Sequence, residues 1–118
     1  MRLKELFSLI GVLIFSLPVL AQDKTDSFKV YGNCGMCKSR IEKAAKVDGV
    51  SAASWNKDTK MFKVTYDAGK VSSESVQKNI AAVGHDTELF EAQDKVYKKL
   101  PECCLYERKR EVKKSQEQ

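Results

Sequence analysis

The sequence predicts an α+β domain in which two helices pack on one face of an antiparallel sheet, in the order βαββαβ. Apolar and polar residues alternate over 61–66, with Phe62, Val64 and Tyr66 on one side, which is the period of a strand. Apolar residues also recur at helical spacing in two separate stretches. In chain order the predicted elements are a strand over 27–31, a helix over 36–46, strands over 50–56 and 61–66, a helix capped by Ser72 or Ser73, and a strand over 86–90.

The first strand and the first helix are joined by a short loop. Phe28 and Val30 give the stretch before the loop its strand character. Ile41 and Ala45 belong to a small apolar face on the helix that follows, and small side chains allow that helix to lie close to the sheet. Asp48 and Gly49, just after residue 46, are expected to stop this helix, because glycine suits a left-handed C-cap.

The next part of the domain begins with a hairpin. Trp55 lies on one face of the second strand, and the polar residues at 57–60 form the turn to the third strand. A stripe of apolar residues then marks the second helix, which is expected to end at Gly84. The stripe consists of Val76, Ile80 and Val83.

The two ends of the chain are expected to lie outside the domain. Arg2 and Lys4 precede an apolar run over 6–20, which is shorter than a membrane-spanning helix and leads into small residues. This pattern is typical of a cleaved signal peptide, with a retained membrane anchor as the alternative, and it predicts a periplasmic or secreted protein. The predicted division is a signal peptide over 1–21, a polar lead-in over 22–26, the domain over 27–91, a short C-terminal helical extension over 92–106, and a charged, disordered tail over 107–118.

Composition limits the classes of function. The chain carries a formal net charge of +5, and its predicted tail is rich in lysine and arginine. An export signal argues against nucleic acid as a partner, so the tail is interpreted as a solvated segment. The sequence shows no paired-carboxylate site, nucleophile–base pair or phosphate-binding loop, so the protein is not expected to be an enzyme.

Cys34 and Cys37 are the residues that carry chemistry. They are separated by two residues and lie on the turn between the first strand and the first helix. Free N–H groups and the helix dipole favour a thiolate at such a position, and thiolate is the form that binds metals and attacks disulfides. The βαββαβ order also brings the loop that contains His85 to the same end of the domain. The motif therefore predicts soft-metal binding or thiol redox chemistry.

On these elements the sequence resembles the heavy-metal-associated domain family, which includes copper chaperones, periplasmic mercury-binding proteins and modules of metal-transporting ATPases. The resemblance covers about residues 28–90 and implies a ferredoxin-like βαββαβ sandwich. Gly32 departs from the family, which usually has a buried methionine two residues before the first cysteine. The segments that carry the resemblance are Asn33 to Cys37, Asp48 to Val50, Phe62 to Asp67, and Ala82 to Asp86.

The resemblance implies that Cys34 and Cys37 bind one soft metal ion through their thiolates. Copper(I) is the first candidate and mercury(II) is an alternative, while zinc would need further ligands. The ion would come from, or go to, a metal-transporting membrane protein or another metal carrier. The protein would act as a monomer or as a dimer bridged by a shared ion. Met36 is expected to pack inward or lie exposed, with a thioether ligand as the alternative.

Three more residues are possible additional ligands, and each has an alternative role. His85 is either a ligand that would widen the site toward zinc or a solvent-exposed histidine that tunes its electrostatics. Cys103 and Cys104 either complete a site with three or four sulfurs, bind a second ion, exchange electrons with the first pair, fasten the extension by a disulfide, or are inert. Metal or redox participation is favoured for them. Lys38 either offsets the charge of the site or is an ordinary surface lysine.

Two other functions stay open from the sequence. One is a periplasmic thiol-disulfide oxidoreductase that uses Cys34 and Cys37, since Cys-Gly-Met-Cys at a helix start is also similar to thioredoxin-like sites. Against it, no tryptophan precedes Cys34 and the predicted domain contains no proline. The other is a partner-binding module in which the cysteines are structural.

Overall fold

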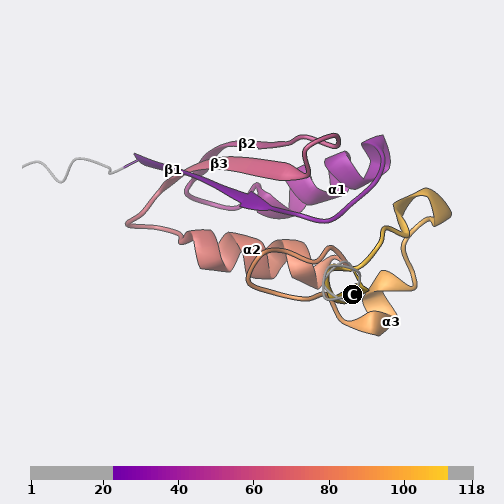
Figure 1. Cartoon of the computed structure of the whole chain (residues 1–118). Helices are drawn as coiled ribbons and strands as arrows, with labels where there is room; N and C mark the ends of the chain where they lie inside the picture. The colour runs from indigo at the N-terminus through magenta and orange to yellow at the C-terminus, as the bar shows by residue number, and fades with distance from the viewer. Residues whose placement is uncertain (1–22, 112–118) are drawn as a thin grey trace, which may run out of the picture.

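The computed structural model describes residues 23–111 (Figure 1). The predicted signal peptide over 1–21 and residues 112–118 of the predicted tail lie outside the described residues. Between residues 23 and 111, no helix is both long and apolar enough to cross a membrane. The elements are β1 (Asp23–Lys29), α1 (Gly35–Ala45), β2 (Val50–Trp55), β3 (Met61–Asp67), α2 (Ser73–Ala82), α3 (Asp94–Tyr97) and the 3₁₀ turn η2 (Glu102–Cys104).

The sheet has three antiparallel strands in the order β1-β3-β2, with β3 in the centre. Phe28 of β1 and Trp55 of β2 both pair with Phe62 of β3, and all three side chains are buried. The rings of Phe28 and Phe62 stack with their centroids 5.2 Å apart. Val64 and Tyr66 are buried on the same face, so the predicted alternation along β3 is confirmed.

The first strand begins earlier than the sequence predicts. Asp23 pairs with Asp67 at the end of β3, and Thr25 Oγ1 lies 3.0 Å from Thr65 Oγ1. Residues 23–26 are therefore strand and not a separate lead-in. Their polar side chains are largely exposed and give no apolar alternation that would predict a strand. The strand forms because β3 supplies backbone partners along its whole length.

The predicted fourth strand over 86–90 is reduced to one bridge between Val30 and Thr87. After that bridge the chain turns. Thr87 N donates to Phe90 O at 2.7 Å, and Phe90 N donates to Thr87 Oγ1 at 3.1 Å. These bonds close a turn and use backbone groups that a strand would present to its neighbour. The three-stranded sheet and its helices nevertheless form the predicted ferredoxin-like α+β fold.

The helices α1 and α2 contact each other and contribute to one core with the strands. Cys37, Ile41 and Ala45 are buried on one face of α1. The helix α2 is capped by Ser72, one of the two serines predicted for this role. Ser75 N donates to Ser72 Oγ at 3.1 Å, and Ser72 N donates to Ser75 Oγ at 3.3 Å, which is a reciprocal capping box.

The C-terminal extension, which in the structure comprises residues 92–111, folds over the end of the domain where α1 begins and α2 ends (Figure 1). Its helix α3 is shorter than the predicted one. Leu100 follows α3 and packs on Gly84, whose φ of 110° suits glycine. A Cβ atom at Gly84 would lie 3.0 Å from Leu100 Cδ2, so this glycine leaves room for the extension.

The ordered chain continues into the region predicted to be a disordered tail over 107–118. Arg108 is 3% exposed, and its Nη2 and Nε donate to the two carboxylate oxygens of Asp86 at 2.7 and 3.0 Å. Arg108 also pairs with Asp94. The prediction of disorder is therefore wrong for residues 107–111. A buried ion pair with a carboxylate far away in the sequence fixes them, and local composition does not reveal such a pair.

Candidate metal centre

Cys34 and Cys37 lie at the start of α1. Cys34 is the N-cap residue, with an extended backbone (φ −127°, ψ 178°), and its carbonyl accepts from Lys38 N at 3.1 Å. Cys37 lies in the first turn and is buried, whereas Cys34 is half-buried. The N–H groups of the first turn, which have no partner inside the helix, favour negative charge on sulfurs at this end.

Trp55 explains the glycine that precedes the cysteine loop. A Cβ atom at Gly32 would lie 3.0 Å from Trp55 Cη2 and 3.2 Å from Cys37 Cβ. The indole Nε1 donates to Val30 O at 2.9 Å, and the ring is buried. The tryptophan therefore provides the apolar packing under the loop that Gly32 itself lacks.

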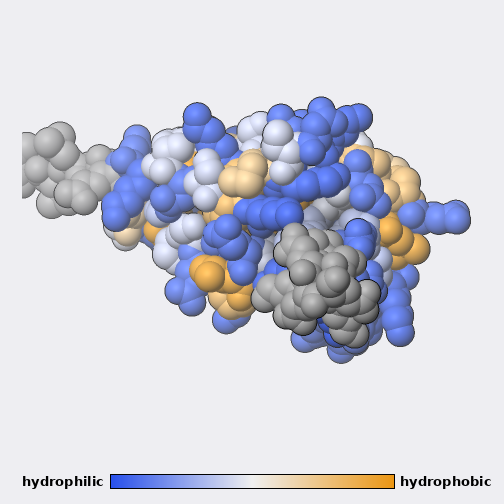
Figure 2. Space-filling view, in the orientation of Figure 1, coloured by the Kyte–Doolittle hydropathy of each residue, from blue (hydrophilic) through white to orange (hydrophobic). Residues whose placement is uncertain are grey.

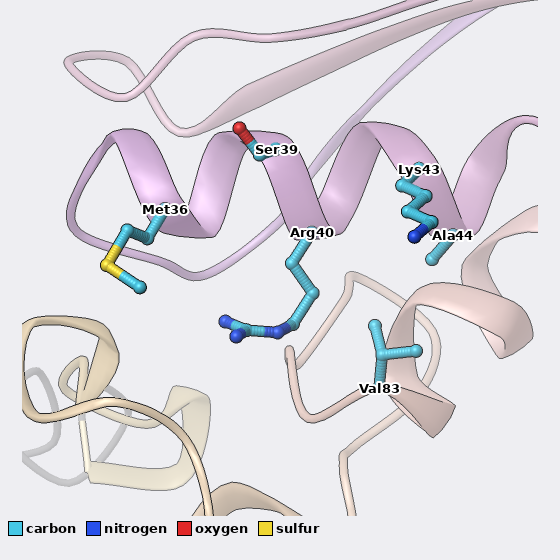
Figure 3. Close-up of a pocket in the computed structure, with 6 residues that line it drawn as sticks. All are labelled: Met36, Ser39, Arg40, Lys43, Ala44 and Val83. Atoms are coloured by element: carbon cyan, nitrogen blue, oxygen red, sulfur yellow. The ribbon is translucent and has the colours of Figure 1, made fainter.

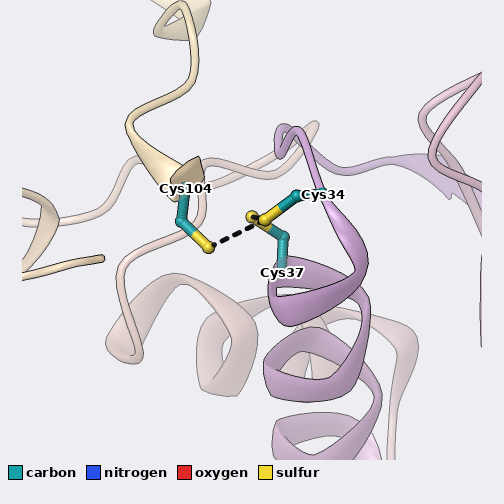
Figure 4. Close-up of side chains that lie close together, drawn as sticks. All are labelled: Cys34, Cys37 and Cys104. Atoms are coloured by element: carbon teal, nitrogen blue, oxygen red, sulfur yellow. Dashed lines mark hydrogen bonds between the residues drawn. The ribbon is translucent and has the colours of Figure 1, made fainter. Parts of the chain in front are cut away.

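The extension brings Cys103 and Cys104 to the same place. Cys34 Sγ is 3.5 Å from Cys37 Sγ, 3.4 Å from Cys104 Sγ and 2.9 Å from Cys103 Sγ. All four cysteines are free thiols. Figure 4 shows Cys104 pointing from the extension toward the two cysteines of α1. The sulfurs of Cys34, Cys37 and Cys104 all lie within 4.8 Å of one another, and these three residues are named here the sulfur trio.

Hydrogen bonds and burial shift the pKa values of the thiols in opposite directions. The hydrogen bond with Cys103 is the main reason that the pKa of Cys34 falls from 9.0 to about 6. The same hydrogen bond raises the pKa of Cys103. Burial raises the pKa of Cys104 well above its ordinary value. The lowered pKa favours the thiolate of Cys34, which is the form that binds a soft ion.

His85 is buried, so the interpretation of a solvent-exposed histidine is wrong. Its Nδ1 lies 2.8 Å from Tyr31 O; a carbonyl only accepts, so Nδ1 carries the proton and Nε2 does not. Among the described residues Nε2 has no hydrogen-bond partner. Burial lowers the pKa of His85 to about 4, and its ring stacks on Tyr106 with the centroids 5.3 Å apart. The structure does not bring a histidine nitrogen into the sulfur trio.

Arg40 is the basic residue beside the sulfurs that the sequence interpretation missed. Its Nη1 donates to Cys104 Sγ at 3.5 Å. Arg40 lies about one turn after Cys37 on α1, and this helical spacing is the signal that could have identified it. Lys38, which the sequence offered for offsetting the charge, instead pairs with Glu42 and donates to Trp55 O at 2.9 Å.

A groove of about 700 Å³ opens next to the cysteines (Figure 3). Met36 and Arg40 extend into it from α1, and Val83 faces them from the end of α2. Met36 is 54% exposed, and its Sδ lies 3.6 Å from Cys103 Sγ. Figure 2 shows apolar patches in more than one place, one of them at the right edge of the view, on a surface that is mainly hydrophilic. The other residues that line the groove are Ser39, Lys43 and Ala44.

Proteins of similar sequence are named for mercury transport, although no family model matches the chain. The chain is 31% identical over 85 residues to the mercuric transport protein periplasmic component of Pseudomonas aeruginosa, a match that covers 70% of this chain and 93% of that protein. The chain belongs to the heavy-metal-associated domain family. The protein of the same name from Acinetobacter calcoaceticus is 29% identical over 89 residues, which are 74% of this chain and 98% of that protein.

Solved structures share this heavy-metal-associated fold. The CopZ metallochaperone is 33% identical with a TM-score of 0.52, and the match covers 54% of this chain and 98% of CopZ. Oxidized MerP from Ralstonia metallidurans CH34 is 30% identical with a TM-score of 0.53, and the match covers 57% of this chain and 96% of MerP. Almost the whole of each structure thus corresponds to little more than half of this chain, so part of this chain has no counterpart in them.

Proposed function

We propose that this heavy-metal-associated protein carries or buffers a soft metal ion, which it holds through Cys34 and Cys37. The observation that supports this most directly is the pair of sulfurs 3.5 Å apart at the start of α1. The names of its relatives agree with a soft metal as cargo, since they include mercuric transport components and a metallochaperone. The ion is cargo to be passed on and not a resident cofactor.

Copper(I) is the first candidate for the ion and mercury(II) is the second. Thiolates are soft ligands, and sites made of sulfur alone select soft ions. Zinc is only the third candidate. Structural zinc sites take four ligands, so zinc would need two more than Cys34 and Cys37 supply. Cys103 could supply a fourth sulfur, since its Sγ lies 2.9 Å from Cys34 Sγ.

Binding and release would proceed by ligand exchange without oxidation or reduction. Cys34 offers its thiolate first, and Cys37 releases its thiol proton to water as its sulfur bonds to the ion. On transfer, a thiolate of the partner bonds to the ion, while a departing cysteine of this chain takes up a proton. A partner can reach the half-buried Cys34 more easily than the buried Cys37, so Cys34 is expected to leave first.

The proposed location is the periplasm or the outside of the cell. The relatives are named as periplasmic components, and the first residues of the chain have the pattern of a signal peptide. The proposed donor or acceptor is a metal-transporting membrane protein or another metal carrier. The protein would work as a monomer, or as a dimer in which two Cys34 loops share one ion.

Anaerobic metal titration followed by native mass spectrometry tests this proposal. The reduced protein is expected to bind one copper(I) or mercury(II) ion tightly, and Cys34→Ser/Cys37→Ser is expected to lose tight binding. Met36→Leu is the matched control, because Met36 lies between the two cysteines and is exposed. It is expected to bind like the natural sequence, and a loss there would instead indicate a thioether ligand. Unchanged binding by the double serine variant would contradict the proposal.

A thiol-disulfide oxidoreductase is the second candidate, favoured by the free thiols and by the pKa of about 6 at Cys34. In that case the Cys34 thiolate would attack a substrate disulfide, and Cys37 would then displace the bound substrate thiol to leave a Cys34–Cys37 disulfide. An assay of turnover with a disulfide substrate separates the candidates. Turnover supports the oxidoreductase, and tight stoichiometric metal binding without turnover supports the carrier.

A further inference from the structure

The C-terminal extension is fixed to the domain on both sides of Cys103 and Cys104. Before the pair, Leu100 packs on Gly84. After the pair, Tyr106 is buried, and its hydroxyl donates to Gly84 O at 2.7 Å. The two cysteines are therefore held in place by the fold of the domain.

A buried ion pair adds a second anchor after the cysteines. The side chains of Arg108 and Asp86 are 4% and 1% exposed. Arg108 bonds to both carboxylate oxygens, and two parallel bonds of this kind fix the orientation of both groups. The backbone of Lys109 also donates to Asp86 Oδ2, at 3.2 Å. The position of the extension is thus defined by directional, charged contacts as well as by apolar packing.

The two adjacent cysteines face opposite environments. Cys104 is buried with its Sγ directed at Cys34 Sγ, while Cys103 is exposed. Their own sulfurs are 3.9 Å apart and are not joined by a disulfide. One cysteine of the pair therefore lies inside the cluster, and its neighbour lies at the surface beside it.

The spacing of the sulfurs favours three ligands over two. With metal–sulfur bonds of about 2.3 Å, the sulfurs of a linear two-coordinate site lie about 4.6 Å apart, and those of a trigonal site lie about 4.0 Å apart. Cys34 Sγ is 3.5 Å from Cys37 Sγ and 3.4 Å from Cys104 Sγ. A trigonal site therefore needs smaller movements of the sulfurs than a linear site does.

Arg40 supplies a positive charge where a third thiolate would need one. Three thiolates around a copper(I) ion carry a net charge of −2, and around mercury(II) a net charge of −1. The Arg40 guanidinium donates to Cys104 Sγ at 3.5 Å, so it would offset part of this charge at the third sulfur. Lys38, on the same helix, is committed to Glu42 and to Trp55 O.

We propose that Cys104 is a third ligand to the ion held by Cys34 and Cys37, and that Cys103 is the surface thiol through which the ion is exchanged. This inference rests on the proposed function, because it assumes that Cys34 and Cys37 bind the ion. Each exchange step forms one metal–sulfur bond and breaks another. Cys103 gives its thiol proton to water as it binds, the departing thiolate takes up a proton, and the ion keeps its oxidation state.

X-ray absorption spectroscopy of the anaerobic one-to-one copper(I) complex tests the inference, since it counts the sulfurs around the ion. Cys104→Ser and Cys103→Ser form a matched pair, because the two residues are adjacent and only the first is buried. The natural protein and Cys103→Ser are expected to show three sulfurs, and Cys104→Ser two. Competition with a chelator is expected to show at least about tenfold weaker binding for Cys104→Ser, since even ligand-supporting residues have effects of that size. Cys103→Ser is expected to keep three sulfurs around the ion and to pass the ion to a thiol acceptor more slowly.

The possible results separate this inference from the proposed function. Two sulfurs in the natural protein, with unchanged affinity in Cys104→Ser, would overturn the third ligand and leave the carrier intact. No tight binding by the natural protein would overturn the carrier itself. If Cys104→Ser unfolds, as judged by circular dichroism, Arg40→Gln takes its place, because it keeps every thiol. Weaker copper(I) binding by Arg40→Gln supports the inference, and unchanged binding counts against it.

Discussion

The two cysteine pairs reach the same point by different physical routes. Cys34 and Cys37 are placed by a strand-to-helix turn, which depends on residues close to them in the chain. Cys103 and Cys104 are placed by anchors that lie outside the pair and bind to distant parts of the domain, of which Arg108 is the most buried charge. The first pair should therefore stay in place when the extension is damaged. The second pair should be lost when its anchors are lost.

Arg108→Met is expected to have the largest effect on the placement of Cys103 and Cys104. It leaves the buried Asp86 carboxylate without its cation, a change that typically lowers the free energy of unfolding by about 3–5 kcal/mol. Urea unfolding of the metal-free protein measures this loss. Cys104 is expected to become open to alkylation, while Cys34 and Cys37 still bind metal.

Arg110→Met is the matched control for that variant. Arg110 pairs with Asp94 at the surface and is 49% exposed, so its removal is expected to cost no more than about 1 kcal/mol. Equal losses in the free energy of unfolding in the two variants would show that the buried Arg108 pair stabilises the protein no more than the exposed Arg110 pair.

At acid pH the natural protein and Arg108→Met are expected to differ less in their free energy of unfolding. Burial alone would raise the pKa of Asp86, but the hydrogen bond with Arg108 and those from the backbone lower it below 3.8. The stabilisation is therefore present above the ordinary pKa and is lost as the pH falls through the lowered value. In Arg108→Met the unpaired buried carboxylate has a raised pKa, so protonation relieves its cost. Urea unfolding from pH 7 to pH 3 measures both trends, and a constant difference would contradict this account.

Gly84→Ala tests the contact between Gly84 and Leu100 that anchors the extension. Gly84 has a φ of 110°, and a Cβ atom would lie 3.0 Å from Leu100 Cδ2, so alanine is expected to cost about 1–3 kcal/mol. Gly49→Ala is the control, because Gly49 has a φ of 94° and its added Cβ would meet Lys70 rather than the extension. Both variants should be less stable by urea unfolding. Only Gly84→Ala should expose Cys104 to alkylation, and equal exposure in both would count against the anchor.

Cys103→Ala is expected to change the acidity of Cys34 without changing the fold. The hydrogen bond with Cys103 is the main reason that the pKa of Cys34 lies at about 6, so the variant should move that pKa upward. Thiolate forms above the pKa, so alkylation of Cys34 at pH 7 should become slower. The pH dependence of iodoacetamide labelling, read by mass spectrometry, measures the change. Met36→Leu is the control, because it changes a neighbour of Cys103 and keeps the Cys103 thiol beside Cys34. A similar shift in Met36→Leu would contradict the role of the thiol.

Lys38→Met should have the smallest effect. The Lys38–Glu42 pair is 43% and 26% exposed, and such pairs contribute about 0–1 kcal/mol to the free energy of unfolding. Copper(I) affinity should be unchanged, in contrast to Arg40→Gln. A loss of affinity in Lys38→Met as large as that in Arg40→Gln would show that charge near the site acts without a direct contact to sulfur.

The parts of the fold that depend on neighbours in the chain could be predicted from the sequence. The alternation of Phe62, Val64 and Tyr66 predicted β3, because a strand repeats every second residue. Ser72 and Ser73 were the two candidate caps that predicted the start of α2, because a cap acts within one turn, and Ser72 is the cap in the structure. The position of Cys34 at the start of α1 followed from the same kind of local pattern.

The parts that failed depend on partners far away in the chain. The charged sequence around Arg108 is typical of a solvated tail, and only the structure reveals the buried pair of Arg108 with Asp86. His85 was interpreted as a possible exposed loop residue, because Tyr106, which stacks on it, comes much later in the sequence. The predicted strand over 86–90 is too long, because the side chain of Thr87 accepts from Phe90 N and closes a turn. The apolar residues near Thr87 give no sign of this turn in the sequence.

The outer edge of β1 is almost unpaired. On that side the described residues form one bridge, between Val30 and Thr87, so the backbone groups along Asp23–Lys29 have no strand beside them. Open edges of this kind invite strands from other molecules and lead to aggregation unless charges interrupt them. The charged side chains along this strand therefore act as gatekeepers against aggregation at high concentration. Those charged side chains are Asp23, Lys24, Asp26 and Lys29.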